Sequence, residues 1–266
     1  MSEDEEANTE TNDDRKRCPF PVTCCNNTNF FRLKQDNATG YVLLRMGNGA
    51  LIGSNFILGS TLIYLAESEI GCEDGDCGDR KVYGFKPSSL LTLSATVSAL
   101  LSAFLLPIVG AIVDYTSHRR RLGICTALLL MTIQAIQIGT NQSTWFIMLI
   151  LQSINGFLYQ TITLTGNAYL PEIASQETDD KATTAYSAKV FMHMFTTESL
   201  FLIIVSAVAI ALNLDTVQQS MFSQGLDVVV SGLTYFLAWY FLQNRQPKAI
   251  LPERSNLLCE GFRQVA

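Results

Sequence analysis

Long apolar segments are the feature that most restricts how this chain can fold. A helix needs about 20 largely apolar residues to cross a bilayer, because the hydrocarbon core is about 30 Å thick and each residue advances about 1.5 Å. We identify six such segments in the 266-residue chain, at roughly 42–66, 88–113, 122–140, 144–168, 190–212 and 226–243. We therefore expect an all-α integral membrane protein built as a six-helix bundle.

Composition agrees with a membrane protein. Hydrophobic residues make up 48% of the chain and charged residues 16%, whereas soluble domains carry about 25% charged residues. Segments 88–113, 122–140 and 226–243 are the most uniformly apolar. Segments 144–168 and 190–212 carry more polar residues than a lipid-facing helix tolerates, so we expect those two to line an interior.

The regions before and after the apolar segments differ from them in character. The start, "MSEDEEANTETNDD", is acidic and polar and lacks the apolar core of a signal peptide. We expect a disordered acidic cytoplasmic tail over 1–40, the six-span bundle over 41–244, and a cytoplasmic linker or tail over 245–266. With this topology, Arg80, Lys81 and Lys86 are the basic residues on the outer side and all the others lie inside. This bias predicts that both termini are cytoplasmic.

The hydrophilic loop "GCEDGDCGDRK" (71–81) follows the first span. Cys72 and Cys77 would lie in an oxidising compartment, close enough in sequence to close a small disulfide loop. The acids of this loop, Glu73, Asp74, Asp76 and Asp79, also fit a hard cation. We favour the solvated disulfide loop and predict no metal site.

A charged turn, "GAIVDYTSHRRR" (110–121), joins the second and third segments. An ionisable residue at the membrane edge is costly unless it is paired. Asp114 can pair with the arginines of the same turn, Arg119, Arg120 and Arg121, or with a helix N-terminus elsewhere. The alternative is a basic stop signal that contains an incidental acid. Gly110 allows another helix to approach closely.

A second motif, "GNAYLPEIA" (166–174), closes the fourth segment. Pro171 has no amide donor and disfavours helical geometry in the residue before it, so we expect the span to end or kink there. Glu172 can accept hydrogen bonds from the start of a following helix or pair with the arginine turn. We favour this pairing over a role in transport.

Both motifs and "AYSAK" (185–189) resemble the vacuolar-effluxer (autophagy-related, UMF-type) branch of the major facilitator transporters. Tyr115 and Ser117 depart from the wider superfamily's basic residue and glycine, but fit this branch. The resemblance implies the N-terminal half of a twelve-span transporter that moves small organic solutes, amino acids among them, by alternating access. It implies a vacuolar or other endomembrane location, and a signature loop that stabilises one access state. A chain of six spans is then either a fragment or one of two chains that pair.

Polar residues within the spans are the candidates for solute binding or ion coupling. They recur at helical spacing in the first, fourth and fifth segments: Asn48, Asn55, Gln152, Asn155, Tyr159, His193 and Glu198. An intramembrane carboxylate such as Glu198 is either a proton carrier or the counter-charge to a substrate ammonium. His193 can share a proton path with it, although five residues separate them. The alternative is a polar pair that bridges two helices.

Other chemistries lack their motifs. The chain has no Gly-rich phosphate loop with its lysine, no Cys/His zinc spacing and no G-x-S-x-G nucleophile motif. We therefore expect no enzyme activity, no cofactor and no nucleic-acid partner. The expected partners are a small solute, with protons as a candidate coupling ion, the lipid bilayer, and a second six-helix half or a dimer partner. The rival function is a non-transporting six-span protein that acts as an assembly or regulatory partner.

Overall fold

The computed structural model describes residues 26–72, 80–174, 180–244 and 261–263, and these are helical almost throughout. The elements run in the order α1 (Asn26–Glu69), η2 (Pro87–Ser89), α2 (Leu90–Tyr115), α3 (Arg119–Gln137), α4 (Trp145–Asn167), α5 (Leu170–Ala174), α6 (Asp180–Leu212) and α7 (Thr216–Phe241). The all-α expectation is confirmed. The part of the predicted tail from Asn26 onward belongs to α1.

Five helices in the described part of the chain are long and apolar enough to cross a membrane. Their apolar stretches are Asp36–Glu69, Pro87–Tyr115, Trp145–Asn167, Tyr186–Leu212 and Thr216–Phe241. Helix α3 forms where the third span was expected, but it begins with Arg119, Arg120 and Arg121 and is not among these five helices. It turns Thr126, Gln134 and Gln137 into the bundle, where they are buried.

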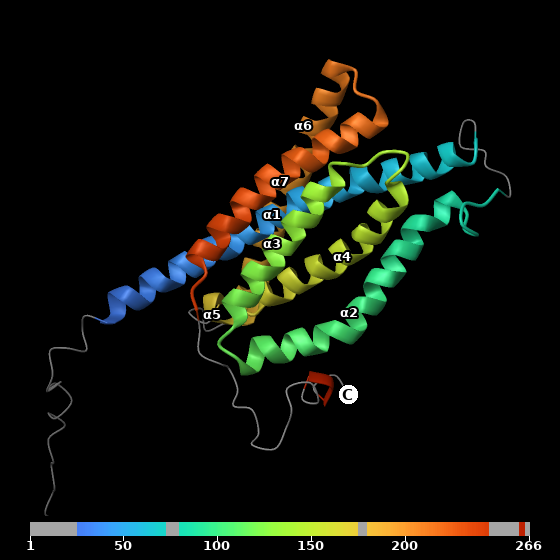
Figure 1. The fold of residues 1–266 in the computed structure, drawn as a ribbon. Helices are drawn as coiled ribbons and strands as arrows, with labels where there is room; N and C mark the ends of the chain where they lie inside the picture. Colours follow the sequence, from blue (N-terminus) through green and yellow to red (C-terminus); the bar gives the residue numbers. More distant parts are fainter. Residues whose placement is uncertain (1–25, 73–79, 175–179, 245–260, 264–266) are drawn as a thin grey trace, which may run out of the picture.

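Helix α1 lies at the centre of the bundle. It packs against α7, α6 and α4, as Figure 1 shows for the crossing of the blue, orange and yellow helices. Glycines make the close approach possible, because a Cβ on Gly49 would collide with the backbone carbonyl of Met194, and one on Gly47 would meet the Tyr235 ring. The most buried apolar stretch is therefore α1, while α6 exposes most of its surface. This last finding differs from the interior position expected for 190–212.

Helix α2 is bent and packs mainly on α4 (Figure 1). Pro107 lies inside it, and a proline removes one helical hydrogen bond and crowds the preceding turn, which accounts for the bend. The outer face of α2 carries large exposed side chains such as Leu100 and Phe104. Such a face suits contact with lipid or with another apolar helix.

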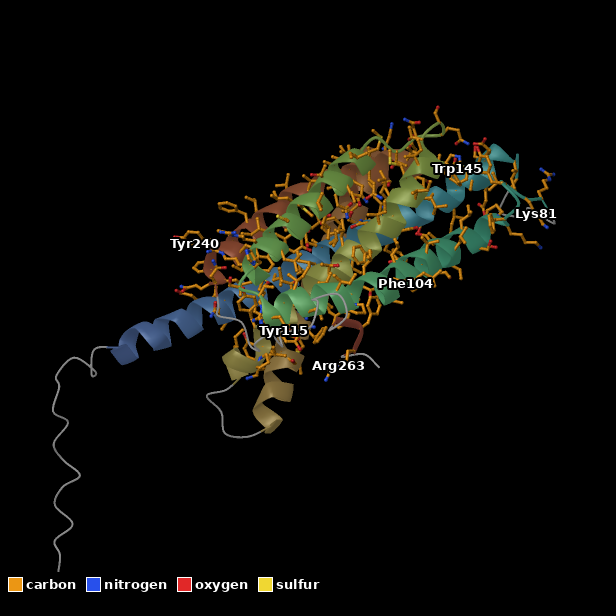
Figure 2. The ribbon with its side chains drawn as sticks, turned by 60° about the horizontal axis from the view of Figure 1, so that its bottom comes forward. Lys81, Phe104, Tyr115, Trp145, Tyr240 and Arg263 are labelled. Carbon is orange, nitrogen blue, oxygen red and sulfur yellow. The ribbon has the colours of Figure 1, made fainter. Side chains whose placement is uncertain are left out.

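The bundle has two ends, which we call the Glu69 end and the Asn167 end after the residues that close α1 and α4. At the Glu69 end, the carboxylate of Glu69 accepts hydrogen bonds from the Trp145 indole at 3.0 Å and the Gln142 amide at 3.2 Å. Figure 2 shows Trp145 at this end, and Tyr115 and Tyr240 at the opposite end. Aromatic residues at both ends are typical of membrane interfaces.

Candidate functional site

The predicted amides come together as bridges between helices. The Asn55 side-chain oxygen accepts hydrogen bonds from Gln134 and Asn155, each at 3.1 Å, and so joins α1 to α3 and α4. One turn further toward the Glu69 end, Gln152 accepts from Gln137 at 3.1 Å. Three of these five amides were predicted as site residues, and their partners on α3 were not. Buried amides in a bundle tie helices together.

Asn48 links α1 to two other helices. Its side-chain oxygen accepts from the Tyr235 hydroxyl of α7 at 2.8 Å, and its amide donates to the Thr163 hydroxyl of α4 at 3.3 Å. Asn48 is fully buried and Tyr235 is 2% exposed. The seven-residue spacing of Asn48 and Asn55 therefore places both in the bundle interior, where they bind different partners.

Arg45 is a site residue that sequence reasoning missed. It was counted among the cytoplasmic basic residues, but it lies within the apolar stretch of α1 and is only 2% exposed. Its guanidinium donates to the Tyr41 hydroxyl at 3.1 Å and to the Asn167 side chain, and it lies between the rings of Tyr41 and Phe191. Among the described residues, no carboxylate forms an ion pair with it. In the sequence, the position of Arg45 inside the apolar segment 42–66 is the feature that could have identified it.

Tyr159 interacts electrostatically with this arginine and with Glu198. The Tyr159 phenol also hydrogen-bonds to Thr163. One carboxylate oxygen of Glu198, Oε2, is buried and has no hydrogen-bond partner in the part of the chain that the structure describes. His193 is exposed on the same helix. The fold therefore brings Tyr159 to Glu198 but does not bring His193 to either.

Asp227 is the second residue that sequence reasoning missed. It lies in α7, is 0% exposed, and accepts a hydrogen bond from Ser231. Segment 226–243 is among those expected to be the most uniformly apolar, although its second residue is this acid. A lone acid inside an apolar segment was the available signal.

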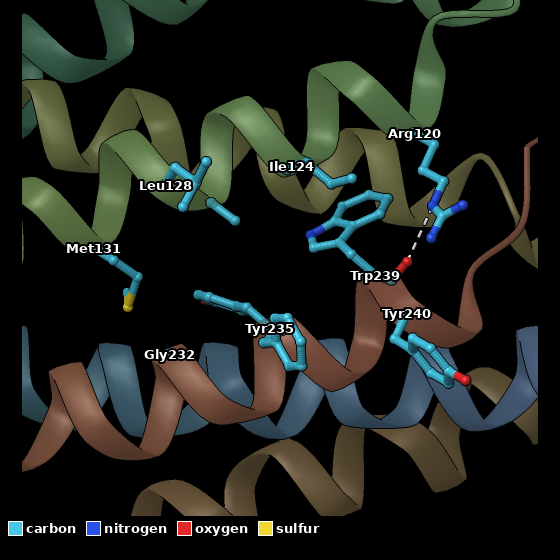
Figure 3. A pocket seen from close by; sticks show the side chains of 10 residues that line it. Arg120, Ile124, Leu128, Met131, Gly232, Tyr235, Trp239 and Tyr240 are labelled. Carbon is cyan, nitrogen blue, oxygen red and sulfur yellow. Dashed lines mark hydrogen bonds between the residues drawn. The ribbon is translucent and has the colours of Figure 1, made fainter.

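The arginine turn has a clear structural role. Arg119, which is 5% exposed, donates to the backbone carbonyl oxygens of Val113 at 3.2 Å and Ala168 at 3.1 Å. Arg120 donates to the carbonyl oxygen of Trp239 at 3.1 Å, drawn as a dashed line in Figure 3. These carbonyls belong to the C-terminal ends of α2, α4 and α7, where unpaired carbonyls favour a positive charge.

Asp114 acts on this turn at longer range. Burial lowers the pKa of the Arg119 guanidinium, and Tyr169 and Asp114 oppose that shift. Arg121 is exposed, and the face of Gly110 is open, since no atom lies within 4 Å of a Cβ added there. The conformational-switch role of Gly110, Asp114 and the three arginines stays a prediction.

Some predicted residues lie partly or wholly outside the described structure. The fourth span ends at Asn167 and Pro171 lies in the short helix α5, as expected, but the Glu172 side chain is outside the described residues. Cys72 is disulfide-bonded. Cys77 and the four acids of the loop also lie outside the described residues, so the Cys72–Cys77 pairing stays a prediction.

An apolar groove lies between α3 and α7 (Figure 3). It has a volume of about 250 Å³, and its lining includes Leu128, Met131, Tyr235 and Trp239. Leu128 is exposed, so the groove opens on the flank of the bundle. The groove does not include Arg45 or the polar residues around it. Of the residues described as lining the groove, Tyr235 is the one that hydrogen-bonds to Asn48.

Comparison with known proteins identifies the family of this chain. Neither the curated proteins nor the solved structures contain a match to this chain. The model of the vacuole effluxer Atg22 like family matches residues 65–266, which include both sequence motifs, the arginine turn and helices α2 to α7. Most of α1, with Arg45, Asn48 and Asn55, precedes the matched stretch. The match covers well over half of the chain, and the chain therefore belongs to the vacuole effluxer Atg22 like family, a family of membrane transporters.

Proposed function

We propose that this protein moves small zwitterionic solutes, with amino acids as the first candidates, and that Arg45 and Glu198 bind the two charged ends. The observation that carries the proposal is the buried Arg45 guanidinium, which has no ion-pair partner among the described residues. A buried charge in a membrane span is unfavourable by several kcal/mol unless another charge compensates it. A substrate carboxylate supplies that compensation.

Glu198 supports the second half of this proposal. Its buried Oε2 atom lacks a donor in the described structure, and a substrate ammonium has donors to offer. Tyr159 interacts electrostatically with both charges. A site with a cation on α1 and an anion on α6 matches a solute that carries one charge of each sign.

Alternating access fits the polar bridges around this site. Asn48, Asn55 and Gln152 hold α1, α3, α4 and α7 to one another through single hydrogen bonds, each of which contributes about 0.6 kcal/mol in membrane bundles. Bonds this weak can exchange as the helices rock. In this proposal, both termini are cytoplasmic, the membrane is vacuolar, and a second six-helix half or a second copy covers the exposed face of α6.

The test is uptake of radiolabelled alanine by proteoliposomes that contain the purified full-length protein alone. We expect Arg45→Gln to lower uptake at least about tenfold, equivalent to about 1.4 kcal/mol of lost transition-state or substrate binding, while Arg121→Gln leaves it unchanged because Arg121 is exposed. Unlabelled propionate, which lacks the ammonium group, should compete with alanine in the wild type and not in Arg45→Gln.

Two results would contradict the proposal. Wild-type uptake that Arg45→Gln does not alter would remove Arg45 from the binding site. No uptake of any solute by the protein alone would favour the rival function, an assembly or regulatory partner. Glu198→Gln serves a second purpose, because an unchanged pH profile of transport would show that Glu198 is not the proton-coupling acid.

A further inference from the structure

A row of polar side chains is buried where α7 packs on α1. Ser220, Ser223, Gln224, Asp227 and Ser231 are each 0% exposed. Ser220, Gln224, Asp227 and Ser231 follow one another at spacings of three or four residues, and Ser223 lies beside Gln224, so the five share one face of α7. This face meets α1, since Gln224 donates to the backbone carbonyl of Ser54 at 3.3 Å and Ser231 donates to that of Gly47 at 3.0 Å. We call these five residues, with Gly47 and Ser54, the α1–α7 seam.

The hydrogen bonds around Asp227 favour a protonated carboxyl group. The Ser231 hydroxyl lies within hydrogen-bond distance of both the Gly47 carbonyl oxygen and Asp227 Oδ1. It has one proton to offer to these two acceptors. When Asp227 carries a proton, the carboxyl group donates to Ser231 and Ser231 donates to Gly47, so both acceptors, Ser231 Oγ and the Gly47 carbonyl oxygen, have a donor.

Among the described residues, no positively charged side chain forms an ion pair or hydrogen bond with Asp227. The titratable groups that interact electrostatically with Asp227 or its neighbours are Tyr235 of α7, Tyr159 of α4, Arg45 of α1 and Glu198 of α6. The other titratable residues described on α1, α6 and α7 (Asp36, Tyr41, Tyr64, Glu67, Glu69, Tyr186, Lys189, His193 and Tyr240, with Asp215 at the N-cap of α7) have no hydrogen bond to Asp227, and the arginines of α3 lie at the Asn167 end. Arg45 donates to Tyr41 and Asn167. The other carboxylate oxygen, Asp227 Oδ2, has no donor among the described residues. An unpaired carboxylate in such a place is strongly unfavourable.

We propose that Asp227 is a proton-binding site, protonated in the state described and deprotonated when α1 and α7 separate. The rest of the seam offers a route for the proton. Ser54 Oγ, Ser223 Oγ, Ser220 Oγ and Gln224 Oε1 are buried without partners in the described structure, and they lie between Asp227 and the N-terminal end of α7. Hydroxyl and amide groups without protein partners are those that bridging waters bind.

Loss of the proton changes the contact between the two helices. The carboxyl O–H bond breaks, the proton leaves through water, and the Ser231 hydroxyl turns to the new carboxylate. Gly47 then loses its side-chain donor one residue from Asn48, which Tyr235 holds. Proton occupancy therefore controls the attachment of α1 to α7 beside the candidate solute site. The proton site stands without transport, whereas its coupling to solute movement rests on the proposed function.

Infrared spectroscopy of the full-length protein in lipid vesicles tests the site directly. At neutral pH, exposed carboxylates are ionised, so a carbonyl stretch of the protonated acid reports a buried group. We expect the wild type to show this band, Asp227→Asn to lose it, and the matched variant Glu198→Gln to keep it. Ser231→Ala retains the acid and should shift the band to higher frequency, because the carboxyl group loses its acceptor.

Defined outcomes overturn the proposal. A wild-type spectrum equal to that of Asp227→Asn, or a Ser231→Ala band at the wild-type frequency, would show that Asp227 does not carry a proton bound to Ser231. Loss of the band when sodium chloride replaces choline chloride at constant pH would identify a cation site instead. The Ser231→Ala measurement keeps the test valid if Asp227→Asn does not fold.

The pH profile of alanine uptake tests the coupling. We expect the wild-type rate to change at least about tenfold between acidic and neutral pH, and Asp227→Asn to have a flat profile. An Asp227→Asn profile equal to the wild type overturns the coupling. Absence of uptake by the wild type contradicts the proposed function, while the infrared result still decides the proton site.

Discussion

The two sides of α1 are built differently. Toward α6, Gly49 and Gly53 bring the backbones together, and buried Phe201 and Val205 fill the contact. Toward α7, the contact includes apolar residues such as Tyr41 and Ala238 but also a row of buried hydroxyl groups, amides and a carboxyl group, several without partners among the described residues. Buried polar groups without partners are unfavourable for stability. Packing alone therefore accounts for the α6 side of α1, whereas it does not account for the buried polar groups on the α7 side, where the proton site is proposed.

The largest expected effect is on the α6 side. We expect Gly49→Ala to destabilise the protein by about 1–3 kcal/mol, because a Cβ there collides with the backbone carbonyl of Met194. Unlike a side chain, this carbonyl cannot avoid the collision by changing its rotamer. Gly225→Ala in α7 is the matched control, because a Cβ there has no neighbour within 4 Å. Thermal unfolding in detergent measures both. Equal melting temperatures would contradict the close contact between α1 and α6.

A smaller effect is expected where the α7 side has a complete hydrogen bond. Tyr235→Phe removes the donor to Asn48 and should destabilise the protein by about 1 kcal/mol. Tyr240→Phe is the control, because Tyr240 is 69% exposed. Chemical or thermal unfolding should separate the two variants. A Tyr235→Phe variant as stable as Tyr240→Phe would show that this bond does not hold α1 to α7.

The smallest effect is expected at Ser54. Its hydroxyl group is buried without a partner in the described structure, so Ser54→Ala should change the free energy of unfolding by less than about 0.5 kcal/mol or stabilise the protein slightly. If bridging waters bind Ser54 in the α1–α7 seam, Ser54→Ala should also slow proton exchange with Asp227, and the transport rate should then adjust more slowly after a change of pH. A stability loss above 1 kcal/mol would mean that Ser54 has a partner in the folded protein.

Sequence patterns predicted the helices well because apolar length is a local property. The ends of the second and fourth spans and the effect of Pro171 were found where expected. Family membership also followed from two short motifs, which the family match confirms. Helix α3 also forms where the third segment was expected, although the arginines of its first turn keep it out of the five apolar stretches. Gln134 and Gln137 face the interior of the bundle, where they join α3 to α1 and α4.

The candidate site was only partly predictable. Asn55 and Asn155 were selected for their polarity, and the fold joins them by a hydrogen bond. Arg45 and Asp227 are visible in the sequence as charges within apolar segments, but their partners are distant in the chain, as Asp227 and Gly47 show. Whether a charge near a span end faces water or the protein interior depends on such partners. Periodicity within one helix does not contain that information.

The arginine turn has a mechanical consequence. Arg119 and Arg120 fasten the ends of α2, α4 and α7 at a single point. Helices fixed together at one end can splay at the other, so we expect this turn to act as a pivot and the Glu69 end to move further. A small rotation about the pivot would be amplified along the length of α7, and the α1–α7 seam is the first contact that it would open.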